Sequence, residues 1–175
     1  MHDLSELPQL IDTNGYIYVF PNGPLSVPLG SSMVGFAWAP LSESKTEQDV
    51  TMMEALLLGF VDEIMARYHT IPGEIILGGF SQGAILTYQI GLPRPGMFAG
   101  LISLSGFIEE THRLKTRLPS NPIQPVFIAH GTQDEIIPID LCHKSRDFLK
   151  TYGYSPSFHE YQTGHQVTQD MVYDL

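Results

Sequence analysis

Short apolar runs alternate along the chain with longer stretches in which apolar residues recur every three or four positions. The first run, residues 15–20, is β-branched and aromatic and is followed by a Pro-Asn-Gly-Pro turn. Such a run predicts a buried strand that ends in a turn. We expect residues 25–41 to follow as a loop that holds Phe36 and Trp38.

A long amphipathic helix is predicted over residues 46–68. Thr46 and Asp49 have the spacing of a capping box, in which each side chain bonds the backbone N–H of the other residue. A periodic apolar stripe of the kind that follows is typical of a helix with one buried face. The stripe consists of Val50, Met53, Leu57, Phe60, Val61 and Ile64.

A sharp turn from strand to helix is predicted next. Residues 74–77 have the pattern of a short apolar strand, residues 78–83 are rich in glycine, and residues 84–90 indicate a helix. Further on, residues 99–105 and 125–130 are buried runs typical of inner strands of a parallel sheet. The rest of the pattern predicts a polar loop at 109–122, a helix at 139–152, a strand at 157–161 and a last helix from residue 167.

Strands that alternate with helices predict an α/β fold, and the length of 175 residues predicts one continuous domain over residues 1–175. The composition is 43% hydrophobic and only 16% charged, which excludes a disordered chain. The formal net charge is −10, and no basic cluster offsets it. We therefore expect neither nucleic-acid binding nor docking to anionic membranes.

Neither a disulfide framework nor a metal centre is expected from the cysteines and histidines. Cys142 is the single cysteine, and we interpret it as a small buried hydrophobic residue. The seven histidines lack the spacing of metal ligands, so we expect no metal. No apolar run reaches the roughly 18 to 20 residues of a membrane span, and no export signal opens the chain, so a cytoplasmic location is the default expectation.

The glycine-rich turn carries the candidate chemistry. Residues 79–83 fit the Gly-x-Ser-x-Gly nucleophile elbow, which places Ser81 between a strand and a helix. A serine in an ordinary glycine-rich turn would give the same pattern, so its partners matter. A serine nucleophile needs a nearby base and a carboxylate that orients the base.

Asp134 and His165 follow Ser81 in the order expected for this fold, and each comes after a predicted strand. The carboxyl ends of parallel strands meet at one edge of the sheet, where such sites form. Glu135 competes with Asp134 for the acid role. The rival bases for His165 are His130, for which a structural hydrogen bond is expected, and His159, inside the last strand.

The chain resembles the carboxylesterase, phospholipase and acyl-protein thioesterase group of α/β-hydrolases. The resemblance implies a three-layer sandwich with a mostly parallel central sheet. It also implies hydrolysis of a carboxylic ester or thioester without a cofactor, with Ser81 as nucleophile, His165 as base and Asp134 as its orienter. The motifs that carry it are residues 78–84, Ser103-Leu104-Ser105-Gly106, His130-Gly131 with Asp134 and Pro138, and Gly164-His165.

The sequence departs from this family at its front. The family usually carries a strand that ends in a Leu-His-Gly motif ahead of the first segment here. A backbone N–H of that motif supplies one oxyanion-hole donor. No such motif precedes Gly15. We therefore expect a chain clipped at both ends, with its front strand missing and the backbone N–H of Gln82 as the remaining donor. The alternative function is a weakened or inactive fragment that acts by binding or self-association, in which a neighbouring copy covers the open sheet edge.

The substrate pocket is the least defined part of the prediction. Trp38, Phe107 and Ile137 are candidate substrate contacts, although each also fits a packing role. Phe36 and Ile136 are further candidates of the same kind. The expected partner is a small-molecule ester or thioester.

Overall fold

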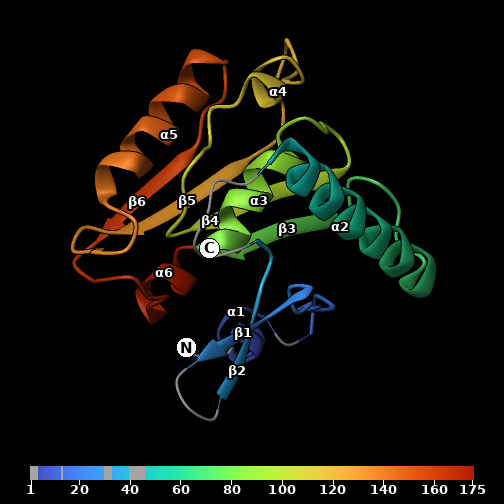
Figure 1. The fold of residues 1–175 in the computed structure, drawn as a ribbon, viewed down its shortest axis with the longest axis horizontal. Coiled ribbons are helices and arrows are strands. Elements are labelled where there is room, and N and C mark those ends of the chain that lie inside the picture. The colour runs from blue at the N-terminus through green and yellow to red at the C-terminus, as the bar shows by residue number, and fades with distance from the viewer. Residues whose placement is uncertain (1–3, 13, 30–32, 40–45) are drawn as a thin grey trace.

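A four-stranded parallel sheet forms the centre of the molecule (Figure 1). The computed structural model describes residues 4–12, 14–29, 33–39 and 46–175. In spatial order the strands follow one another as they do along the chain. They are β3 (Ile75–Phe80), β4 (Phe98–Leu104), β5 (Val126–Gly131) and β6 (Ser157–Tyr161).

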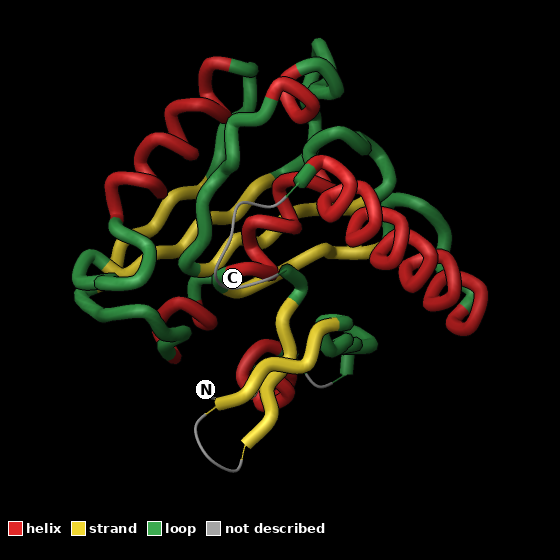
Figure 2. Tube along the Cα trace, viewed as in Figure 1, coloured by secondary structure: helices red, strands yellow, loops and turns green. Residues whose placement is uncertain are grey.

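Helices connect the strands and cover the sheet (Figure 2). The core cluster on one face joins Leu101 and Ile128 of the sheet to apolar residues of the longer helices α2, α3 and α5. Of these, α3 packs on β3 and β4, α2 packs on α3, and α5 packs on β5. On the other face, Met171 packs against Leu104 and Ala129. The layers confirm the predicted α/β sandwich. The helices are α2 (Glu47–Tyr68), α3 (Gln82–Gly91), α4 (His112–Lys115), α5 (Ile139–Thr151) and α6 (Gln169–Tyr173).

The predicted strand at residues 15–20 is wrong. The segment belongs to no helix or strand and pairs with no strand among the described residues, and Tyr16 and Ile17 are 58% and 62% exposed. A β-prone run becomes a strand only when a neighbouring strand bonds its backbone groups. Two short helices that the pattern did not predict precede this segment, η1 (Leu4–Glu6) and α1 (Pro8–Ile11).

The predicted loop at residues 25–41 is also wrong where the structure describes it. Two strands, β1 (Leu25–Leu29) and β2 (Met33–Ala37), pair antiparallel, with Leu25 opposite Ala37. Pro28 obscures the strand pattern, because proline cannot donate to a ladder, yet it is tolerated in a two-stranded ribbon whose edges are free. Phe36 on β2 is half exposed.

The helix α2 confirms its predicted start. The Thr46 hydroxyl accepts the backbone N–H of Asp49 at 3.2 Å, and the Asp49 carboxylate accepts the backbone N–H of Thr46 at 2.9 Å. These bonds satisfy N–H groups that have no partner inside the helix. The helix ends at His69, which adopts a left-handed conformation with φ of 56°.

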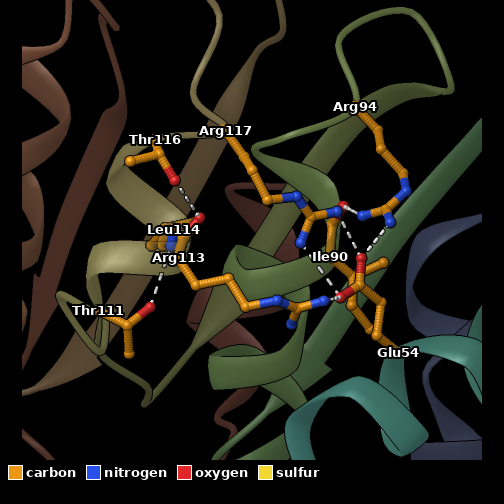
Figure 3. Close-up of polar contacts among 8 residues, drawn as sticks. All are labelled: Glu54, Ile90, Arg94, Thr111, Arg113, Leu114, Thr116 and Arg117. Atoms are coloured by element: carbon orange, nitrogen blue, oxygen red, sulfur yellow. Dashed lines mark hydrogen bonds and ion pairs between the residues drawn. The ribbon is translucent and has the colours of Figure 1, made fainter. Parts of the chain in front are cut away.

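A buried carboxylate ties α2 to the chain after α3 and to α4 (Figure 3). Glu54 on α2 is only 5% exposed and pairs with Arg94, Arg113 and Arg117. Burial by itself would raise the pKa of Glu54, but the hydrogen bonds from Arg117 and Arg94 and the charge of Arg94 lower it to about 2. The carboxylate therefore stays ionised and holds three guanidinium groups together.

Three further observations concern features that the sequence singled out. Cys142 is fully buried in the main core cluster, in line with its interpretation as a packing residue. Among the helices that the structure describes, none has the length and apolar character needed to cross a membrane. Over the same residues, β3 pairs with β4 alone, and its other edge has no strand beside it.

Candidate active site

The turn from β3 to α3 has the geometry of the predicted elbow. Ser81 lies between the two elements with φ of 56° and ψ of −117°, a strained conformation for a residue with a side chain. Glycine is required at position 79, because a Cβ built there would lie 2.1 Å from the Gly83 carbonyl carbon. The backbone N–H of Ser81 donates to the Leu104 carbonyl at 2.9 Å, which fixes the turn to β4.

Asp134 lies in the loop after β5 with a fully buried side chain. One of its oxygens, Oδ1, accepts the backbone N–H groups of Ile136 and Ile137 at 2.9 and 2.8 Å. Burial acts to raise the pKa of Asp134, but these two hydrogen bonds and the bond to His165 outweigh it and lower the pKa. The carboxylate is therefore ionised at neutral pH.

His165 joins Asp134 to Ser81. Its Nδ1 lies 2.7 Å from Asp134 Oδ2 and its Nε2 lies 2.9 Å from Ser81 Oγ. The carboxylate can only accept, so Nδ1 carries the proton, and Nε2 of the neutral ring accepts from the serine hydroxyl. The His165 ring also packs against Phe80, with ring centroids 4.8 Å apart.

The loops after β5 and β6 approach each other closely enough to hold this arrangement. Thr132 N–H donates to the Tyr161 carbonyl at 2.8 Å, and Gln133 N–H donates to the Thr163 carbonyl at 2.9 Å. A Cβ built on Gly131 would lie 2.3 Å from the Thr163 oxygen, so only glycine fits there. Backbone contacts between the loops thus set the distance between Asp134 and His165.

Comparison with known proteins identifies the family of the chain. The sequence model described as phospholipase/carboxylesterase matches residues 3–175. The chain belongs to the phospholipase/carboxylesterase family. Members of this family are serine hydrolases that act on carboxylic ester and thioester bonds.

Individual phospholipase/carboxylesterase relatives agree with the family match. Acyl-protein thioesterase 1 of Candida albicans is 29% identical over 98% of this chain and 82% of its own length. Acyl-protein thioesterase 1 of Saccharomyces cerevisiae is 31% identical over 76% of this chain, and the match spans 62% of the yeast protein.

Solved structures share the fold. Arabidopsis thaliana SOBER1 superposes with a TM-score of 0.81 at 22% identity, covering 98% of this chain and 87% of that one. The Bacillus cereus carboxylesterase superposes with a TM-score of 0.75 at 19% identity, covering 98% of this chain and 77% of that one. The phospholipase/carboxylesterase match thus extends to the three-dimensional architecture.

The rivals for the acid and base positions lie outside the Ser81–His165–Asp134 chain of hydrogen bonds. Glu135 is exposed. His159 bonds Ser157 Oγ at 2.8 Å on β6 and stacks on Phe127. His130 is fully buried, and its Nε2 lies 2.7 Å from the Ile137 carbonyl. Within this phospholipase/carboxylesterase fold, His130 contacts Asp134 at 3.4 Å, but His165 is the one histidine of the described residues that bonds both Asp134 and Ser81.

Besides its predicted role as an oxyanion donor, Gln82 makes side-chain contacts that the sequence did not reveal. As the first residue of α3 its backbone N–H has no partner inside the helix, which suits an oxyanion donor. The side-chain Oε1 of Gln82 accepts the backbone N–H of Trp38, and its Nε2 donates to the Ala39 carbonyl, both at 3.1 Å. Trp38 and Gln82 also line one small cavity together. The side chain thus holds the segment after β2 against the elbow.

The remaining pocket candidates lie in different settings. Ile137 is buried, and its backbone N–H bonds Asp134. Phe107 is half buried and follows Gly106, which packs against the elbow. Ile136 is 70% exposed. Across the described ranges, no group of three or more His, Cys, Asp or Glu side chains could hold a metal ion.

Proposed function

We propose that this chain is a serine esterase or thioesterase that works through a Ser81–His165–Asp134 triad and a covalent acyl-enzyme. The observation that carries the proposal is the pair of hydrogen bonds at His165, 2.7 Å to Asp134 and 2.9 Å to Ser81. The membership of the chain in the phospholipase/carboxylesterase family supports the bond type. The two relatives named above supply the thioester possibility through their name, acyl-protein thioesterase 1.

The proposed reaction begins with the serine. Ser81 Oγ attacks the carbonyl carbon of the ester or thioester, and His165 Nε2 takes the hydroxyl proton. The ionised Asp134 stabilises the imidazolium through the Nδ1–H bond. His165 then returns the proton to the leaving alcohol or thiol, and the acyl group remains on Ser81. Water, deprotonated by the same histidine, releases the acid.

The oxyanion that forms in each step needs donors placed before the reaction. The backbone N–H of Gln82 at the start of α3 is the donor we assign, because in a nucleophile elbow the residue after the serine supplies one oxyanion-hole N–H. A donor of this kind is typically worth about a hundredfold to a thousandfold in rate. Trp38, Phe107 and Ile137 are the residues we propose for the substrate wall. For Trp38, the hydrogen bond from its backbone N–H to the Gln82 side chain supports the assignment.

A second candidate is self-association through the exposed edge of β3, with weakened or no catalysis. Over the described residues β3 has one strand neighbour, and Ile76 on it is 46% exposed. An open strand edge is a template for pairing with another chain. Light scattering coupled to size exclusion tests this candidate, since a monomer at every concentration contradicts it.

The deciding experiment is labelling with a fluorophosphonate probe, read by intact mass. The protein should gain one adduct, and Ser81→Ala should gain none while keeping the circular dichroism of the parent. A matched control exists, because Ser157 also bonds a histidine, His159, at 2.8 Å but lies on a regular strand. Ser157→Ala should label as the parent does. Labelling that survives Ser81→Ala would overturn the proposed function.

A further inference from the structure

A second histidine lies close to Asp134 Oδ2, the oxygen of the proposed triad acid that also faces His165. His130 lies on β5, and its side chain is fully buried. Its Nε2 is 2.7 Å from the Ile137 carbonyl oxygen and 3.4 Å from Asp134 Oδ2. Oxygens of these two kinds only accept hydrogen bonds, so Nε2 carries a proton.

The bond from His130 closes a ring of contacts around the Asp134 loop. Ile137 receives the His130 N–H at its carbonyl and gives its own N–H to Asp134 Oδ1 at 2.8 Å. Oδ2 of the same carboxylate faces His165 Nδ1 at 2.7 Å. His130 therefore fixes the segment that orients Asp134, and Asp134 in turn orients His165.

The surroundings of His130 favour a neutral ring. Its Nδ1 is buried and has no hydrogen-bond partner within the part of the chain that the structure describes. The pKa of His130 lies below its ordinary value, chiefly because the ring is buried. The Ile137 carbonyl and the Asp134 charge act to raise the pKa, and the charges of His165 and His143 act to lower it. A proton on Nδ1 would be buried without an acceptor, at the cost of an unpaired polar group.

We propose that His130 is a positioning residue that holds Asp134 toward His165 as a neutral ring protonated at Nε2. The inference rests on the proposed function. A neutral N–H steadies the Asp134 loop without adding a positive charge, so the charge of the carboxylate remains available to the imidazolium that forms on His165. An imidazolium at position 130 would share that carboxylate and weaken the base.

Paired substitutions separate a positioning role from simple packing. The amide nitrogen of His130→Gln can take the place of Nε2 and donate to the Ile137 carbonyl, whereas His130→Leu fills the space without a donor. We expect His130→Leu to lower kcat by about tenfold to a hundredfold with KM within twofold, since small misplacements of catalytic groups have effects of this size. His130→Gln should recover most of that loss. His159→Leu, at a partly exposed histidine outside the site, is the control and should leave kcat unchanged.

Nitrogen NMR of the histidine rings supplies a readout that packing alone does not move. In the parent protein the His130 signals should show the neutral Nε2–H tautomer at pH 7. A ring protonated at Nδ1 at that pH, or equal kcat values for the Gln and Leu variants, would overturn the inference. If His130→Leu does not fold, the tautomer and the His130→Gln rate still decide it. An unlabelled parent in the fluorophosphonate experiment would instead contradict the proposed function.

Discussion

The loops after β5 and β6 and the amino-terminal residues 4–39 differ in how completely their groups are partnered. In the loops, the buried Asp134 carboxylate receives three hydrogen bonds, from Ile136, Ile137 and His165. In the described part of 4–39, large apolar side chains such as Tyr16 and Ile17 are more than half exposed. The region of the proposed triad thus has dense polar contacts, while the described part of 4–39 leaves large apolar side chains exposed.

The sharpest way to break the well-partnered region is Asp134→Asn. The amide presents the wrong hydrogen-bonding group to His165 Nδ1, so the ring is no longer held in the tautomer that accepts the serine proton. We expect kcat to fall by about a thousandfold to ten-thousandfold. Ester turnover measures it, with the exposed neighbour Glu135→Gln as a control that should keep parental activity. Equal losses in the two variants would contradict the assignment of the acid.

The elbow offers the next largest effect through Gly79→Ala. The added methyl would lie 2.1 Å from the Gly83 carbonyl carbon, and the nearest atoms are all backbone atoms of Gly83 and Ala84, which cannot rotate away as a side chain can. We expect a loss of about 3 kcal/mol in the free energy of unfolding, measured by urea denaturation. Gly83→Ala is the matched control, because a Cβ there meets nothing within 4 Å. It should be neutral or slightly stabilising in the helix.

The ion pairs of Glu54 with three arginines test whether paired charges stabilise the protein away from the proposed active site. Glu54→Gln should lower the free energy of unfolding by about 2 kcal/mol at pH 7, because three arginines lose their shared carboxylate. Glu63→Gln, at an exposed position on the same helix, should change it by less than about 0.5 kcal/mol. A similar small change for Glu54→Gln would show that the cluster adds nothing to stability.

The same cluster predicts a pH dependence. The pKa of Glu54 is lowered from 4.5 to about 2 on folding, so the unfolded chain takes up its proton first. The stabilisation is therefore complete above pH 4.5 and is lost as the pH falls toward 2. Urea titrations between pH 6 and 3 should show a smaller decline for Glu54→Gln than for the parent.

The smallest effect is expected in the exposed region. Ile17→Thr should change the free energy of unfolding by less than about 0.5 kcal/mol, because the side chain is 62% exposed. The same substitution at the fully buried Ile128 on β5 should cost about 2 to 3 kcal/mol. A large loss at Ile17 would mean that another surface covers it in solution.

The contrast also explains what the sequence could predict. The helix at 46–68 and the elbow at 78–83 depend on neighbours in the chain, and a local pattern of caps, apolar spacing and glycines specified both. Residues 15–20 have an equally strong strand pattern, but a strand needs a distant partner, which no local pattern reports. The Asp134–His165 pairing is long-range too, and only the shared edge of a parallel sheet and the family resemblance indicated it. The sequence indicated a structural hydrogen bond for His130, which the structure shows. The partner of that bond and the contacts of the Gln82 side chain depend on side-chain directions, for which the sequence carried no signal.

The three arginines gathered on Glu54 also change the electric field that a substrate meets. They engage three of the nine basic side chains but only one of the 19 acidic ones, so the rest of the chain carries eighteen acidic groups against six basic ones. A field of that sign attracts cations and repels anions over about one Debye length, roughly 8 Å at physiological salt. Ester hydrolysis turns a neutral acyl group into a carboxylate. The uncharged acyl group of the substrate is not repelled by this negative field. The carboxylate product is repelled by it, and this favours the departure of the product.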